Sequence, residues 1–239
     1  MSAAVGWGAL AASSLVIGAL LGMLRAWPRR LVGLVLAFGA GALISAVSFD
    51  LAQEGARVGD PGFLGLGLAI GAVTYFTLDR MLERPSPRGN DQGPGESAGP
   101  ALALGAFLDG IPEQAVLGIG IAAGAGVSVG LLVAIFVSNL PEAIGSSTEM
   151  RSAGKRPAAI RRLWLVVAFV CAAATVAGYA VADNVTGNVH AGIDGFAAGA
   201  LLVMLIDSMI PEAVRQGGDI SGLVTVVGFA VAAALSGVS

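Results

Sequence analysis

Apolar residues fill long stretches of this chain, and short polar segments separate them. Each stretch has about 20 residues, the length that a helix needs to cross the hydrocarbon core of a bilayer. The pattern predicts an all-α polytopic membrane protein with eight transmembrane helices, in which residues 1–239 form a single transmembrane domain. The predicted spans are approximately 3–24, 31–55, 62–82, 101–123, 127–147, 162–182, 191–213 and 219–238.

The composition of the 239 residues supports this prediction. Hydrophobic residues make up 56% and charged residues only 12%, against about 25% charged residues in soluble domains. The 13 basic residues do not outnumber the 16 acidic ones, which argues against a nucleic-acid partner. A single cysteine excludes a disulfide framework. These numbers leave the lipid bilayer as the expected partner and exclude an ordinary soluble enzyme.

The basic residues predict the orientation of the chain in the membrane. All of them except Arg57 fall in, or at the span ends beside, the links that follow the first, third, fifth and seventh spans. Cytoplasmic loops are enriched in Lys and Arg, so we expect these links in the cytoplasm, both termini outside, and a multi-pass protein of the cell membrane. The stretch 83–100 is rich in Pro, Gly, Ser and charge, which is typical of a flexible loop, here a cytoplasmic one.

Seven acidic residues form four clusters inside apolar spans, where a carboxylate is tolerated only beside a partner, a cavity or an ion. Helical spacing places Asp109 and Glu113 on one face of their span, and Ser138 and Glu142 on one face of theirs. Proline precedes each of these two glutamates. A proline inside a helix leaves the carbonyl four residues earlier without its usual donor. Broken helices of this kind form ion sites in transporters.

The polar positions fall at three depths, which predicts a pathway for a cation. The basic residues within the spans are too peripheral to neutralise the acids, so an ion or protons must do so. We expect His190 to be a satisfied surface imidazole and Cys171 to be a small apolar filler. The expected pathway has an entrance at Asp50 and Glu54, a central site at Asp109, Glu113, Ser138, Asn139 and Glu142, and an exit at Asp207 and Glu212.

Two short motifs in the fourth and fifth spans resemble those of the ZIP (Zrt/Irt-like) metal-ion transporters. The family has His-Asn-x-Pro-Glu-Gly and His-Glu-x-Pro-His-Glu at these places. This chain has Asp109-Gly110-Ile111-Pro112-Glu113-Gln114 and Ser138-Asn139-Leu140-Pro141-Glu142-Ala143. The resemblance implies that Glu113 and Glu142 are the main metal ligands, with Asp109, Ser138 and Asn139 in the remaining ligand positions.

The resemblance also implies an architecture and an assembly. The family fold is a three-plus-two-plus-three bundle with spans 1–3 and 6–8 as inverted repeats, often in homodimers. The similarity between Asp50 to Glu54 and Asp207 to Glu212 fits that pairing.

The motifs differ from the family pattern because Asp109 replaces the first histidine, Gly110 replaces the asparagine, and the fifth span has no histidine. Ligands that offer only oxygen favour harder ions such as Mn²⁺, Fe²⁺ or Mg²⁺, although zinc also accepts carboxylates. We therefore expect transmembrane transport of a divalent cation (zinc, manganese or iron) as substrate, with no permanently bound cofactor and no enzymatic activity. Three alternatives stay open: a proton-coupled carrier of another solute, a family member that no longer transports, and an intramembrane hydrolase that uses paired carboxylates.

Overall fold

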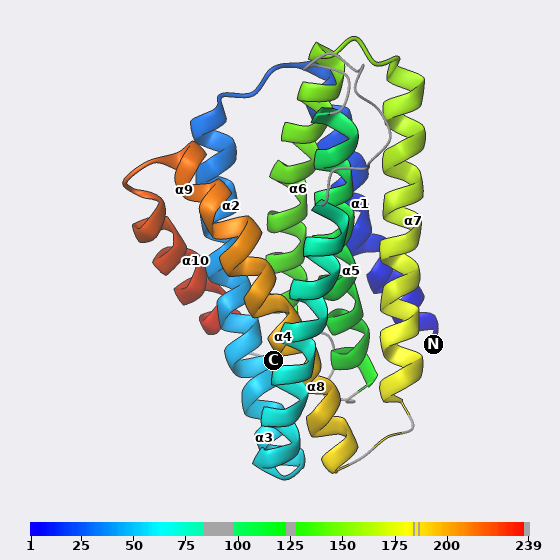
Figure 1. Ribbon diagram of the computed structural model, residues 1–239, viewed down its shortest axis with the longest axis vertical. Helices are drawn as coiled ribbons and strands as arrows, with labels where there is room; N and C mark the ends of the chain where they lie inside the picture. The colour runs from blue at the N-terminus through cyan, green and yellow to red at the C-terminus, as the bar shows by residue number, and fades with distance from the viewer. Residues whose placement is uncertain (84–97, 123–127, 184, 186, 237–239) are drawn as a thin grey trace.

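The computed structural model describes the backbone of residues 1–83, 98–122, 128–183, 185 and 187–236, and their side chains except at 82, 83, 98–109 and 236. The described part is helical, without strands. Its twelve elements join into eight rods, because η1 and η2 are π-helical turns that continue the helices on either side (Figure 1). The elements are α1 (Ser2–Leu24), α2 (Arg29–Ala46), η1 (Val47–Gln53), α3 (Glu54–Val58), α4 (Pro61–Glu83), α5 (Ala98–Ala122), α6 (Val129–Ser152), α7 (Pro157–Ala182), α8 (Asn188–Met204), η2 (Leu205–Met209), α9 (Ile210–Gly217) and α10 (Ser221–Ser236).

Several rods extend beyond the apolar stretches that predict them. The rod that begins at α2 ends at Val58 rather than at 55, and the rod that begins at α8 ends at Gly217 rather than at 213. Charged residues such as Arg57 and Arg215 are good helix formers, so the helix continues where the apolar pattern stops. The predicted loop 83–100 lies outside the described residues, except at its two ends, which belong to α4 and α5.

The surface of the bundle is apolar, as expected for contact with lipid. Six of the described rods are long and apolar enough to cross a membrane, and α10 is a shorter apolar helix. Large side chains point outward on several helices, including Val73 on α4, Phe169 on α7 and Leu223 on α10, each at least 65% exposed. Polar side chains such as Glu113 and Ser138 are instead buried between helices. This arrangement is that of a multi-pass membrane protein.

The rods pack in two groups. One group contains α1, α5, α6 and α7, and the other contains α2 with η1 and α3, α4, α8 with η2 and α9, and α10. Within the groups, α1 packs on α6, α5 on α7, α2 on α10 and α4 on α8. The groups meet where α2 and α10 contact α6 and where α8 contacts α5. The polar residues of α5 and α6 therefore lie near the junction of the two groups.

Glycine allows several of these helix pairs to approach closely. A Cβ built at Gly71 of α4 would lie 1.9 Å from the Phe196 carbonyl oxygen of α8, and one built at Gly41 of α2 would lie 1.8 Å from the Thr225 carbonyl oxygen of α10. Any larger residue would force the backbones apart. Small residues thus fix the packing within each group.

Candidate functional site

A buried carboxylate joins α5 to α6 in the interior of the bundle. Glu113 of α5 is 1% exposed, and Ser138 and Asn139 of α6 are 0% and 1% exposed. Ser138 Oγ lies 3.0 Å from Glu113 Oε1 and 3.1 Å from Oε2, and the Asn139 amide donates to Oε2 over 2.8 Å. The structure therefore brings together three of the five residues predicted for the central site.

Proline shapes this part of both helices. Pro112 lies inside α5 and Pro141 inside α6, each directly before a glutamate. Pro141 has no N–H to donate to the Val137 carbonyl. In the turn of α6 before Pro141, Ser138 Oγ and Asn139 Nδ2 each lie 3.0 Å from the Ile135 carbonyl oxygen. The side chains that contact Glu113 are thus anchored to the helix backbone, which fixes their orientation.

Asn139 also carries an unused acceptor. Its Oδ1 is fully buried and receives no hydrogen bond within the described part of the structure. A Cβ built at Gly110 would lie 3.6 Å from that oxygen and 2.9 Å from the Cys171 sulfur of α7. Buried acceptors normally have a partner. An amide oxygen without a partner, beside a buried carboxylate, is suited to bind a cation.

Glu142 lies one turn beyond Ser138 on the same face of α6 and is half-buried. The buried thiol of Cys171 is within electrostatic range of both Glu142 and Glu113. The charges of both glutamates therefore influence the same thiol, which lies on α7 beside α5 and α6. Asp109 lies on α5, one turn before Glu113, but its side chain is outside the described part of the structure. Whether these residues bind metal together stays a prediction.

In the described residues, no three side chains of the strong metal-binding types come together. No group of three or more His, Cys, Asp or Glu side chains there is arranged to hold a metal ion. The contacts around Glu113 come instead from a hydroxyl and an amide. A cation in this region would therefore depend on Asn139 and Ser138 oxygens as well as on carboxylates.

The predicted entrance and exit lie at opposite ends of the bundle. Figure 1 shows α3 at the lower end and α9 at the upper end, which is also where α1 connects to α2 and α6 to α7. Asp50 lies in η1 and accepts a hydrogen bond of 3.0 Å from Ser128 Oγ, at the start of α6. Asp207 lies in η2 and is exposed. Sequence reasoning did not predict that both aspartates would lie in π-helical turns, which are frequent at functional sites.

The outermost acids of the entrance and the exit are paired with arginines, which the apolar pattern did not predict. Glu54 accepts hydrogen bonds of 2.7 and 2.8 Å from Arg57, and Glu212 is paired with Arg215. Both arginines lie beyond the predicted spans, which end at 55 and 213. Because α3 and α9 continue beyond the apolar stretches, each arginine lies three residues after its glutamate on the same helix face. The outermost acids of both paths therefore have cationic partners.

A cavity of about 450 Å³ opens at the upper end of the bundle, between α2, α6 and α9. Its polar lining includes Arg29 of α2, Thr148 and Glu149 of α6, and Gln216 of α9, which also contacts Glu212. Gly145, three residues after Glu142, lies at its wall. The sequence did not single out Glu149 or Gln216. Helical spacing could have indicated them, because Glu149 shares a face of α6 with Glu142 and Gln216 shares a face of α9 with Glu212.

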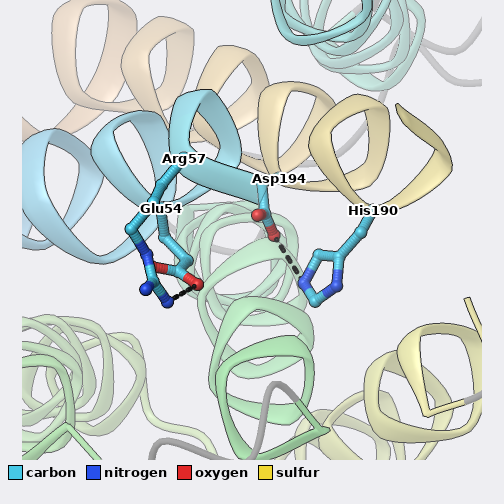
Figure 2. Close-up of polar contacts among 4 residues, drawn as sticks. All are labelled: Glu54, Arg57, His190 and Asp194. Atoms are coloured by element: carbon cyan, nitrogen blue, oxygen red, sulfur yellow. Dashed lines mark hydrogen bonds and ion pairs between the residues drawn. The ribbon is translucent and has the colours of Figure 1, made fainter. Parts of the chain in front are cut away.

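A second polar cluster lies at the lower end, between α3 and α8 (Figure 2). It contains Glu54, Arg57, His190 and Asp194. His190 was expected at the surface but is only 8% exposed, and Asp194 is 2% exposed. Sequence reasoning missed Asp194, although it is an acid in an apolar span, four residues after the single histidine.

Comparison with known proteins gives a similarity to a plant protein. No family model matches the chain. Over 188 residues the chain is 27% identical to a protein of Arabidopsis thaliana named "Putative zinc transporter At3g08650". The matched stretch covers 77% of this chain and 30% of the plant protein, so the chain spans about 30% of that relative's length.

Proposed function

We propose that this chain is a carrier of divalent metal cations of the ZIP type, with its substrate site between α5 and α6. The observation that carries the proposal is the buried group formed by Glu113, Ser138 and Asn139. Ser138 and Asn139 hold the buried Glu113 carboxylate through neutral donors, and a carboxylate inside a membrane protein is a candidate ligand for a cation. The Asn139 oxygen that receives no hydrogen bond adds a cation ligand at the same place.

The packing of the rods supports the inverted repeats of that family. In such repeats α1 corresponds to α7, α2 to α8, α4 to α10 and α5 to α6. When each helix is replaced by its counterpart, every main pair of packed helices becomes another main pair. The α2–α10 pair becomes the α8–α4 pair, and the α1–α6 pair becomes the α7–α5 pair. The two π-helical turns occupy corresponding places in this scheme. Such repeats allow one helix group to move against the other around a central site.

The charge distribution supports an orientation for transport. Basic residues gather at the upper end in Figure 1, where α1 connects to α2 and α6 to α7. We assign this end to the cytoplasm. The cavity beside Gly145 opens at the same end, so it would serve as the release path for a cation that leaves Glu142. The cation would then enter from the end where Glu54 lies.

The similarity to a protein named as a zinc transporter favours zinc as the substrate. The side chains around Glu113 contribute oxygen rather than sulfur or imidazole nitrogen, and such ligands also suit Mn²⁺ and Fe²⁺. We therefore propose a carrier that accepts zinc together with harder divalent ions, rather than one restricted to zinc.

Uptake by proteoliposomes tests this function. Purified protein is offered Zn²⁺, Mn²⁺, Fe²⁺ and Mg²⁺ separately, while a dye reports the internal pH. We expect accumulation of Zn²⁺ and at least one harder ion above that of protein-free liposomes. Proton movement without metal accumulation would support the proton-coupled carrier instead, and no movement of either would support a chain that does not transport.

A further inference from the structure

The first two turns of α8 hold a buried pair of groups that attract cations. His190 Nε2 and Asp194 Oδ1 lie 3.6 Å apart, and the two side chains point toward each other (Figure 2). That distance is too long for a hydrogen bond. His190 Nε2 and Asp194 Oδ2 have no hydrogen-bond partner within the described part of the structure. Both residues are more than nine-tenths buried.

Burial without hydrogen bonds is unfavourable for both groups. Native proteins nearly always give such atoms a partner from protein, water or a bound ligand. Two such atoms on neighbouring side chains, one from an imidazole and one from a carboxylate, indicate that the pair shares a missing ligand. Imidazole nitrogen and carboxylate oxygen are both common ligands of zinc.

The separation of the two atoms fits a small cation between them. Zinc lies ~2.0–2.2 Å from nitrogen and oxygen ligands in tetrahedral geometry, which places two neighbouring ligand atoms about 3.3–3.5 Å apart. The observed 3.6 Å between His190 Nε2 and Asp194 Oδ1 is close to that value. A cation could bridge the pair with only small movements of the two side chains.

A third ligand would come from α3 only if Glu54 moved, because Glu54 is bonded to Arg57 and the three side chains are not arranged as a metal site where they lie. A Cβ built at Gly55 would lie 3.1 Å from Asp194 Cβ and 3.5 Å from Asp194 Oδ2, so α3 packs closely against Asp194 at this glycine. Glu54 is the adjacent residue and lies within electrostatic range of both His190 and Asp194. It is held by Arg57, whose side chain is 73% exposed. Ion pairs this exposed are weak, so a divalent cation can draw Glu54 away from Arg57.

We propose that His190 and Asp194, together with Glu54 once it moves, form a second divalent-cation site. The site lies at the end of the bundle that contains α3, opposite the end where most basic residues gather. The site loads the transported cation before it reaches Glu113. This loading role rests on the proposed function, whereas cation binding itself is inferred from the buried pair of His190 and Asp194, whose facing atoms lie 3.6 Å apart. Because one ligand is an imidazole, the site takes Zn²⁺ in preference to Mg²⁺.

His190 is the single histidine of the chain, so it gives one imidazole signal. Protein labelled with ¹⁵N-histidine is titrated with Zn²⁺ in detergent micelles, and the ring nitrogens are followed by NMR. We expect the ring signal to convert to a metal-bound form near equimolar zinc and to stay unchanged with Mg²⁺. Asp194→Asn should weaken zinc binding by ~10-fold or more, since loss of even an outer partner of a metal ligand costs ~10–100-fold in affinity.

Asp60→Asn provides the matched control, because Asp60 is an exposed acid just before α4 whose carboxylate accepts a hydrogen bond from the Gly62 N–H. Its zinc titration should match that of the unmodified protein. A ring signal that ignores zinc, or a zinc response that Asp194→Asn leaves unchanged, would overturn the site. Proteoliposome uptake separates this result from the proposed function. Uptake with a silent imidazole refutes only the loading site, and a bound imidazole without uptake refutes only the transport proposal.

Discussion

The side-chain amide of Asn139 donates a hydrogen bond of 2.8 Å to Glu113 Oε2, which joins α6 to α5 in the interior of the bundle. The oxygen of the same amide is buried beside Gly110 and receives no hydrogen bond in the described residues. One side chain thus orients the carboxylate and offers a further oxygen next to it. This relationship is the basis of the proposed substrate site.

Replacement of Asn139 should therefore affect metal affinity more than folding. Asn139→Ala removes the donor to Glu113 and the free acceptor, and we expect the KM for metal uptake to rise by ~10–100-fold. The loss of one hydrogen bond between helices should lower the free energy of unfolding by only about 1 kcal/mol. Uptake kinetics and thermal melting measure the two effects. An unchanged KM would show that the Asn139 oxygen does not bind the cation.

Gly110 should matter because it leaves space between Cys171 and Asn139. A Cβ at this position would lie 2.9 Å from the Cys171 sulfur, and overpacking of this kind costs ~1–3 kcal/mol. We expect Gly110→Ala to reduce uptake several-fold and the added change Cys171→Ala to restore most of it. Gly120→Ala on the same helix serves as control, since no atom of another described segment lies within 4 Å of its Cβ position. Failure of Cys171→Ala to rescue uptake would contradict this steric explanation.

The close contact of α4 with α8 gives a prediction about stability. Gly71→Ala should lower the free energy of unfolding by ~1–3 kcal/mol, because the new methyl group would meet the Phe196 carbonyl. Gly65→Ala on the same helix should have almost no effect, since its Cβ position is open. Thermal melting in detergent compares the two variants. Equal midpoints would argue against the packing of α4 on α8.

Labelling of single cysteines tests the orientation. Cys171 is buried and is first removed by Cys171→Ala. Arg57→Cys should then react with a membrane-impermeant maleimide on intact cells, whereas Arg156→Cys should react only after the cells are permeabilised. The opposite result would place the basic end outside and reverse the proposed direction of the path.

Much of the fold follows from the apolar pattern, because a helix must satisfy its own backbone hydrogen bonds in lipid. Each of the eight apolar stretches contains a described helix. The pattern could not give the helix ends, since Arg57 and Arg215 continue their helices into polar surroundings. Nor could it give the π-helical turns at Asp50 and Asp207, which depend on packing against neighbouring rods.

The contacts around Glu113 could be predicted from the sequence only as far as helical spacing determines them. Spacing and the two prolines place Glu113, Ser138 and Glu142 toward the interior, and the structure adds the contacts made by Asn139. The pair of His190 and Asp194 escaped prediction because the chain around them is apolar and short of other ligands. Only the approach of α3 at Gly55 brings Glu54 toward them.

The most direct test of the account is metal uptake by the Glu113→Gln variant in proteoliposomes. Glutamine keeps the size of the side chain and an oxygen that can accept from Ser138, so the bundle should fold normally. Asp219→Asn, which changes an exposed acid between α9 and α10, provides the control. The account predicts that Glu113→Gln loses at least ~10-fold in uptake rate while Asp219→Asn retains the rate of the unmodified protein. Uptake by Glu113→Gln at the unmodified rate would contradict a substrate site at this carboxylate.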